Sequence, residues 1–257
     1  MTLEERVNTR YESLTANDRE MLDRIFRERK NVGNMNSTQL ASFLHVSRTT
    51  LVRLMKKLDL DSYAEFKLLL NRREEDGTGQ IYDLGDIVEE YHGMIDQLKN
   101  HDYQKICEVI SGADTIYLYG TGNEQKAIAE EFKRVFLTFG KCCVDLFDLG
   151  EVISARERFR EKDLFVAVSL SGENEEAVRV VRAARETGIR TMALTRWANN
   201  TLSRICQENL YVGTKTVGQT WGQSYEMVAA FYILLDILLV RCLEYRDRGK
   251  KGRDHED

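Results

Sequence analysis

Residues 35–70 read MNSTQLASFLHVSRTTLVRLMKKLDLDSYAEFKLLL, and the spacing of their apolar residues predicts two short helices joined by a tight turn. The first helix has one apolar face, made by Leu40, Phe43 and Leu44, and the pattern breaks at His45-Val46. Ser47 follows as a side chain suited to cap the start of a second helix. The apolar face of that helix contains Leu51, Leu54, Met55 and Leu58. Two helices joined by three or four residues predict a helix-turn-helix, whose second helix enters the major groove of DNA.

The outer surface of the second helix is basic or hydroxylated, and no carboxylate occurs before Asp59. The side chains concerned are Ser47, Arg48, Thr49, Thr50, Arg53, Lys56 and Lys57. Such groups suit a groove lined by phosphates, so we predict that they bind DNA. The alternative interpretation is an ordinary helical hairpin whose basic face is simply solvated.

The net charge of −5 is unevenly distributed along the chain. Residues 15–73 contain 12 Lys and Arg against 7 Asp and Glu, whereas residues 74–257 contain 23 against 32. The positive charge therefore coincides with the predicted helix-turn-helix, as expected for a DNA-binding surface. The acidic remainder disfavours non-specific contact with DNA.

Composition favours a cytoplasmic protein without a membrane segment. The mean hydropathy is −0.43, 31% of residues are charged, and no apolar stretch follows Met1, so no signal peptide is expected. The most apolar run, residues 228–240, is interrupted by Asp236 and is too short to span a bilayer, so we expect a buried helix there. The five cysteines have no C-x-x-C spacing and no histidine at ligand spacing, which favours free thiols over a disulfide framework or a metal site.

The chain divides into segments of different periodicity. We predict an all-α helix-turn-helix domain over residues 1–73, with a first helix over 15–30 and a last one near 61–73. A polar, glycine-bearing linker and a connecting helix occupy residues 74–100. A second domain covers 101–246, and 247–257 form a charged tail.

The second domain alternates short apolar strands with helices. Strands are expected at 115–119, 142–147, 164–169, 190–194 and 209–212. Helices are expected at 102–111, 123–139, 151–160, 174–187 and 199–207, and a long last helix at about 219–246. This alternation predicts an α/β fold with a five-stranded parallel sheet flanked by helices.

Two strand-end loops stand out as candidate ligand sites, because ligands of such sheets bind beyond the carboxyl ends of the strands. The first loop contributes Gly120, Gly122, Asn123 and Glu124, and the second contributes Ser169, Ser171, Gly172, Asn174 and Glu176. Hydroxyl and amide groups beside the free N–H groups of a helix start suit a phosphate. Ser171 and Asn174 as plain helix N-caps are the alternative.

Both halves of the chain resemble one family. The pattern V-S-x-x-T-L-x-R-x-x-K-K-L, with Y-x-E-F-K at 63–67, resembles the amino-terminal domain of RpiR/MurR-type bacterial transcriptional regulators. The second loop, S-x-S-G-x-N-x-E, is similar to the S-x-S-G-x-T-x-E fingerprint of SIS (sugar isomerase) domains. The resemblance covers roughly residues 15–245. It implies a dimeric or tetrameric regulator that binds operator DNA and senses a sugar-derived metabolite, with no cofactor and no catalytic residues.

The chain departs from the family pattern in its first loop. Glu124 stands where the family usually has a serine on the phosphate, and Asn174 replaces the usual threonine. Thr121 and Glu124 have the spacing of a capping box, which would turn the carboxylate back onto its own helix. After the fourth strand, Arg196 and Trp197 offer a cation for an acidic group and a ring to stack on a sugar, although simple packing explains Trp197 equally well.

An isomerase is the second candidate function, because SIS domains also occur in aldose–ketose isomerases. Such enzymes need a positioned base, and none of the histidines (His45, His92, His101 and His255) falls in a strand-end loop. Glu124 and Glu176 could act as bases, but no acid partner is evident. A regulator whose SIS domain only assembles is the third candidate. The last helix carries Phe231, Ile233, Leu234, Ile237, Leu238 and Val240, enough to face both its own sheet and a partner subunit.

Overall fold

The computed structural model describes residues 3–71, 84–196, 199–220 and 223–253. The chain forms two compact units, one built on helices α1–α6 and one built on helices α7–α13 with the main sheet. Within the described residues, no helix combines the length and apolar character needed to cross a membrane. The described residues leave out 72–83, which contain most of the predicted linker, together with Trp197 and the last four residues of the chain.

Residues 3–71 are helical throughout, apart from short connections. The helices are α1 (Leu3–Arg10), the 3-10 helix η1 (Tyr11–Ser13), α2 (Ala16–Arg27), α3 (Arg29–Val32), α4 (Ser37–Phe43), α5 (Arg48–Lys57) and α6 (Tyr63–Asn71). The predicted helix over 15–30 is divided, because Glu28 leaves helical geometry at φ −104° and ψ 26°. Helix α1 was not predicted, yet Leu3 and Val7 lie in the same buried cluster as Leu22 and Leu51.

The predicted helix-turn-helix is formed by α4 and α5. Helix α4 ends in a Schellman motif, in which the Val46 N–H donates to the Ala41 carbonyl at 2.9 Å and His45 takes φ +57°. Ser47 is the N-cap of helix α5, and its Oγ accepts from the Thr50 N–H at 3.1 Å. The turn is therefore set by one left-handed residue and one N-cap, both within the quoted stretch.

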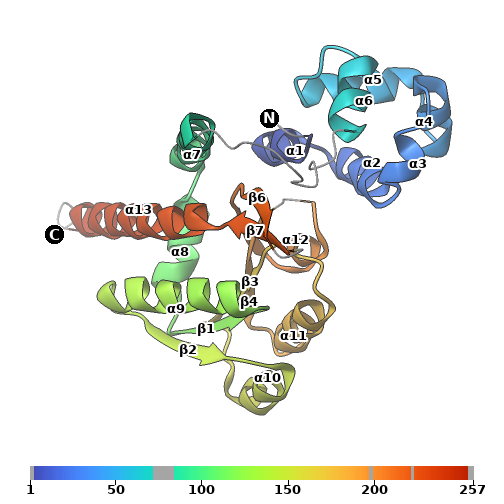
Figure 1. The fold of residues 1–257 in the computed structure, drawn as a ribbon. Coiled ribbons are helices and arrows are strands. Elements are labelled where there is room, and N and C mark those ends of the chain that lie inside the picture. Colours follow the sequence, from blue (N-terminus) through green and yellow to red (C-terminus); the bar gives the residue numbers. More distant parts are fainter. Residues whose placement is uncertain (1–2, 72–83, 197–198, 221–222, 254–257) are drawn as a thin grey trace. The chain divides into compact units, whose positions relative to one another are not determined.

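The second unit contains the predicted five-stranded parallel sheet (Figure 1). Its strands are β1 (Thr115–Gly120), β2 (Cys142–Leu146), β3 (Leu164–Ser169), β4 (Arg190–Thr195) and β5 (Glu208–Tyr211). Their order is β2-β1-β3-β4-β5, and all pairs are parallel. All five strands lie within one residue of their predicted bounds, because continuous apolar runs are a strong signal of a buried parallel sheet.

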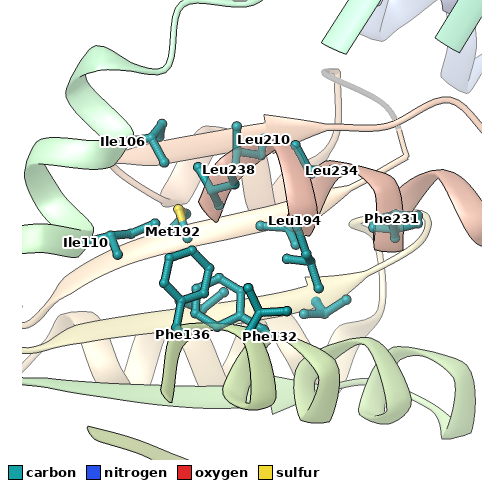
Figure 2. Close-up of a cluster of buried hydrophobic side chains, with 14 of the residues drawn as sticks. Ile106, Ile110, Phe132, Phe136, Met192, Leu194, Leu210, Phe231, Leu234 and Leu238 are labelled. Atoms are coloured by element: carbon teal, nitrogen blue, oxygen red, sulfur yellow. The ribbon is translucent and has the colours of Figure 1, made fainter. Parts of the chain in front are cut away.

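Helices cover both faces of this sheet. One face packs against α7 (Leu84–Asn100), α8 (Gln104–Gly112), α9 (Asn123–Thr138) and α13 (Ala229–Arg253). The other packs against α10 (Leu149–Ala155), which continues into the 3-10 helix η2 (Arg156–Arg158), α11 (Glu175–Arg185) and α12 (Thr201–Ile205). Figure 2 shows Phe132 and Phe136 of α9 meeting Leu234 and Leu238 of α13 over the strands.

The prediction of one long helix from about residue 219 is wrong at its start. Strands β6 (Lys215–Thr220) and β7 (Gln223–Met227) pair with each other in a hairpin, and α13 begins only at Ala229. Val217, Thr220 and Tyr225 belong to the β-favouring residue types. These residues, with Gly222 between the strands, were the available signal for a hairpin.

Candidate functional site

The outward face of α5 is separate from the face that holds the domain together. Leu51, Leu54 and Met55 are buried in the core of the amino-terminal unit. Arg48, Thr49, Arg53 and Lys56 are exposed. These positions, with Val52, form one stripe along the helix, because residues three or four apart lie near one another on its surface.

Three of the predicted DNA-binding residues, Ser47, Thr50 and Lys57, have side-chain partners inside the domain. The Lys57 ammonium pairs with Asp18, a buried carboxylate that also closes the Thr15 capping box at the start of α2. Burial alone would raise the pKa of the Asp18 carboxyl, but hydrogen bonds from Lys57 and Thr15 outweigh it and lower that pKa. The Thr50 hydroxyl shares a hydrogen bond of 2.9 Å with Ser47. Lys57 therefore connects α5 to α2.

Val52 was not among the predicted contacts, yet it lies in the middle of the stripe and is 50% exposed. An apolar side chain there is unusual in an otherwise polar surface. The methyl group of thymine is the apolar feature that the major groove offers to such a side chain. Its place between the predicted contacts Arg48 and Arg53 could have identified Val52 from the sequence.

The two strand-end loops meet because of the strand order. The chain leaves β1 toward β2 on one side and returns to β3 on the other, so the sheet reverses between β1 and β3. Helix α9 follows β1 onto one face and α11 follows β3 onto the other. The Thr121 N–H donates to the Val168 carbonyl at 3.2 Å, which joins the first loop to the end of β3. We call this place, formed by residues 120–124 and 169–176, the carboxyl edge; ligands of such sheets bind at this reversal.

The first loop presents backbone rather than capping side chains. A Cβ on Gly120 would lie 2.5–2.7 Å from backbone atoms of Gln125 and Lys126, so only glycine fits there. The N-cap of α9 is Gly122, which makes Gln125 the third helical residue. The expected capping box between Thr121 and Glu124 is therefore wrong, because the helix starts one residue later than that motif requires.

Glu124 and its neighbour Asn123 are exposed on the first turn of α9. Within the described residues, no hydrogen bond or ion pair of the Glu124 carboxylate is found. Two cations could in principle neutralise it. Lys126 instead lies over the Phe147 ring, with its Nζ 5.6 Å from the ring centroid. Arg196 instead pairs with Glu226 at 2.6 Å.

The second loop is held by its own side chains. Ser169 is buried, and its Oγ accepts from the Gly172 N–H at 3.3 Å. Ser171 is exposed and accepts from the Glu173 N–H at 3.2 Å, while Asn174 caps α11 by accepting from the Ala177 N–H at 2.9 Å. The interpretation of Asn174 as an N-cap is confirmed, and Ser171 closes the turn before it.

Asn200 packs against the second loop and holds it in place. Sequence analysis did not identify it as a site residue. It is 1% exposed, caps α12, and donates from Nδ2 to the Thr195 hydroxyl at 3.0 Å. Gly172 lies directly over it at φ +68°, and a Cβ there would come within 2.1 Å of the Asn200 Oδ1. Glu173 is bound on the same side by the Thr201 N–H at 2.8 Å. The capping pattern of Asn200 and Ser203 was the only local signal.

Glu176 lies at the carboxyl edge beside Tyr119, the penultimate residue of β1. Burial first, and then the negative charge of the neighbouring Glu176, raise the pKa of Tyr119 to about 12. The phenol therefore stays neutral beside a carboxylate on the first turn of α11.

The loop after β4 reaches the same edge. The Arg196 N–H donates to the Leu170 carbonyl at 2.8 Å, so this loop lies beside the one after β3. The Arg196 side chain is directed to Glu226, which also accepts a hydrogen bond from the Thr214 hydroxyl. Arg196 is thus part of an internal ion pair, and Trp197 lies outside the described residues.

Comparison with known proteins assigns both units. The model of the helix-turn-helix domain of the rpiR family matches residues 1–75, and that of the SIS domain matches residues 109–241. The HTH-type transcriptional regulator GlvR of Bacillus subtilis is 28% identical over 254 residues, covering 99% of this chain and 100% of that protein.

Two solved structures share the fold. The NanR protein of Vibrio vulnificus, complexed with ManNAc-6P, superposes with a TM-score of 0.55 at 23% identity, covering 98% of this chain and 97% of the other. The sugar isomerase domain of an RpiR transcription factor from Sphaerobacter thermophilus superposes with a TM-score of 0.53 at 22% identity, covering 66% of this chain and 97% of the other. From the domain matches and their order, this chain belongs to the RpiR family of helix-turn-helix transcriptional regulators that carry a SIS domain.

Proposed function

We propose that the α5 stripe reads operator DNA and that the carboxyl edge binds a sugar-derived effector that controls this binding. The observation that carries the first part is the division of α5 into a buried apolar face and an exposed basic face. Arg48, Arg53 and Lys56 have the charge and freedom to contact bases and phosphates, and Val52 lies between them. The buried pairing of Lys57 makes it the least suited of the predicted contacts.

The carboxyl edge has the features of a ligand site. Two helices, α9 and α11, begin there with their first-turn N–H groups, of which the Ala177 N–H is capped by Asn174, and exposed Ser171, Asn123 and Glu176 lie around them. The NanR structure is of a complex with ManNAc-6P, which supports a sugar derivative as the kind of ligand. Ser169 is too buried to touch a ligand and instead holds the loop.

The effector we favour is neutral or amine-bearing, rather than a phosphosugar held as in the family pattern. Glu124 projects at the helix start where a phosphate would sit, and neither a capping box nor Lys126 nor Arg196 removes its charge. A carboxylate about 4 Å from a phosphate repels it by roughly 4 kcal/mol at an effective dielectric near 20. The same carboxylate accepts hydrogen bonds from sugar hydroxyl or amine groups.

Calorimetry on wild type and Glu124→Ser, with a sugar and its phosphate as a matched pair, tests this preference. We expect wild type to favour the unphosphorylated form and Glu124→Ser to gain affinity for the phosphate. Glu130→Ser is the control, because it removes an exposed charge from the same helix further from its start. Tight phosphosugar binding by wild type, unaffected by the Glu124 substitution, would show that this carboxylate does not select the ligand.

The regulatory part is tested by adding ligands to an operator titration. A thermal-shift screen against phosphosugars, aminosugars and sugar acids first identifies a binder, because a ligand of the native state raises stability by mass action. That binder should then change operator affinity of the full chain. A binder that shifts thermal stability while operator affinity stays constant would favour a SIS domain uncoupled from DNA binding.

We favour a sensor over an isomerase. His92 is exposed on α7, His101 packs its ring against Tyr103 at 4.8 Å between α7 and α8, and His45 belongs to the helix-turn-helix. Among the described residues, none of these imidazoles lies at the carboxyl edge, where a base for proton transfer is needed. Incubating the full chain with aldose and ketose phosphates, followed by NMR of the sugars, should show no interconversion.

Assembly as a dimer or tetramer is proposed through the outer side of α13. Phe231, Leu234 and Leu238 are fully buried in their own domain, so they do not reach a partner (Figure 2). Val240 is 52% exposed, and Ile233 and Ile237 are partly exposed. Sedimentation should show dissociation for Val240→Asp, and a monomeric wild type would contradict this proposal.

A further inference from the structure

Two cysteines from different helices meet inside the SIS domain. Cys107 lies on α8 and Cys242 on α13, and their exposed fractions are 2% and 0%. Each thiol is near enough to the other to change its pKa. The helices that carry them pack directly on each other. Cys206, buried in the hydrophobic cluster on the opposite face of the sheet, has the Thr191 side chain as its hydrogen-bond partner.

Cys107 also lines a cavity of ≈ 770 Å³ between α8 and the carboxy-terminal half of α13. His101, Ser111, Arg241 and Tyr245 are among the other lining residues. Ser111 precedes β1, and its carbonyl accepts from the amine of Lys141, the residue before β2. The cavity therefore lies toward the amino ends of the strands, at the opposite end of the sheet from the carboxyl edge.

The cavity is lined by Cys107, and Cys242 is not among its lining residues. A small electrophile that enters the cavity therefore meets the Cys107 sulfur first. The neighbouring Cys242 thiol lowers the pKa of Cys107, and the Arg241 guanidinium acts in the same direction against the effect of burial. A thiolate is the reactive form of cysteine, so Cys107 is the thiol placed to attack.

We propose that Cys107 and Cys242 form a reversible disulfide when a peroxide reaches this cavity. In the first step, the Cys107 thiolate attacks one peroxide oxygen and the O–O bond breaks, giving a sulfenic acid and hydroxide, which takes up a proton to become water. In the second step, the Cys242 sulfur attacks the Cys107 sulfur, the S–OH bond breaks and a second water leaves. The peroxide is reduced by two electrons, and the two thiols are oxidised.

The disulfide would fasten the last helix of the chain to the helix before the sheet. Its S–S bond of about 2.05 Å is shorter than any contact of two separate thiols, so forming it brings the two sulfurs, and with them α8 and α13, slightly closer. Because the bond is far from the carboxyl edge, this modification does not depend on the identity of the effector.

The test treats the reduced full-length protein with one equivalent of hydrogen peroxide and follows it by mass spectrometry. We expect the intact mass to fall by about 2 Da, with titratable thiols falling from the five of the reduced chain to three. Peptide mapping should show Cys107 joined to Cys242, and dithiothreitol should reverse the change. These readouts need no substitution, so they do not depend on how well a variant folds.

Two variants separate the roles of the thiols. Cys242→Ser should stop at a sulfenic acid on Cys107 that is trapped by dimedone, while Cys206→Ser should form the disulfide as wild type does. A peroxide-treated protein whose only cross-links run through Cys142 or Cys143, or one that keeps Cys107 and Cys242 reduced at a tenfold excess, would overturn the proposal.

Discussion

The outer face of α5 and the carboxyl edge of the sheet place their polar side chains in opposite situations. On α5 the exposed Arg48, Arg53 and Lys56 project from a regular helix whose other face is anchored in the core. At the carboxyl edge, Ser169 and Asn174 are already hydrogen-bonded to the loop that they belong to. A polar residue in the first region is therefore available to a partner, whereas one in the second mainly holds the site in shape.

This difference has a structural cause. Within a helix the backbone N–H and C=O groups hydrogen-bond to one another, so the exposed side chains in its middle are not needed as backbone partners. A loop between a buried strand and a helix has backbone groups that only nearby side chains can satisfy. Substitutions on the outer face of α5 should therefore weaken DNA binding and leave stability unchanged. Substitutions at the carboxyl edge should lower both stability and ligand binding.

The largest effect should come from Gly172→Ala. The new Cβ would lie within about 3 Å of three Asn200 side-chain atoms, and the backbone at φ +68° already disfavours an L side chain. We expect a loss of about 3–5 kcal/mol in the free energy of unfolding, measured in urea. Gly188→Ala is the control: its φ is +86° but nothing lies within 4 Å of the added Cβ, so only about 1–2 kcal/mol should be lost. Equal losses in both variants would remove the Asn200 contact from the explanation.

Asn200→Ala should break the same contact between Gly172 and Asn200, this time by removing the asparagine side chain. It deletes the cap of α12 and removes the amide that donates to the buried Thr195 hydroxyl, so we expect about 2–3 kcal/mol of destabilisation.

 Asn174→Ala is the matched control, because it removes a cap at an exposed position and should cost about 1 kcal/mol. Urea unfolding of both variants measures the difference. If Asn174→Ala proved the more damaging of the two, the network would be centred on α11 and not on the buried asparagine.

Arg53→Ala tests the outer face of α5. Loss of a base contact should weaken operator binding by about 1–3 kcal/mol and relax sequence preference, while the free energy of unfolding stays within about 0.5 kcal/mol of wild type. Lys56→Ala should instead weaken all sequences alike and reduce the salt slope by about one unit, as expected for a phosphate contact. Fluorescence titrations at two salt concentrations distinguish these outcomes. Unchanged binding in both variants and in Arg48→Ala would exclude α5 from the interface.

His45→Gly should have the smallest effect, and a favourable one. His45 takes φ +57° at the end of α4, a conformation in which glycine avoids the steric cost of a side chain. We expect a gain of about 0.5–1 kcal/mol in the free energy of unfolding of the amino-terminal unit, with operator affinity unchanged. A loss of stability would mean that the imidazole makes contacts worth more than the backbone cost.

Sequence alone determined the local elements of this protein. The turn between α4 and α5, the N-cap at Ser47 and the five strands all follow from residues close together in the chain, because caps and apolar periodicity act over a few residues. The departure at Glu124 was also visible there, although its capping box was wrongly assigned, since the start of α9 depends on how Gly120 packs against it.

Only the tertiary structure decided which of these elements meet. The order of the strands placed the loops after β1 and β3 together. The packing of loops and helices buried Asn200 under Gly172 and brought Lys57 to Asp18 and Cys107 to Cys242. These partners are 28 to 135 residues apart in sequence. No periodicity or motif reports such pairs, because they form when whole helices and strands pack, and the free energy that selects them comes from burial of the assembled core.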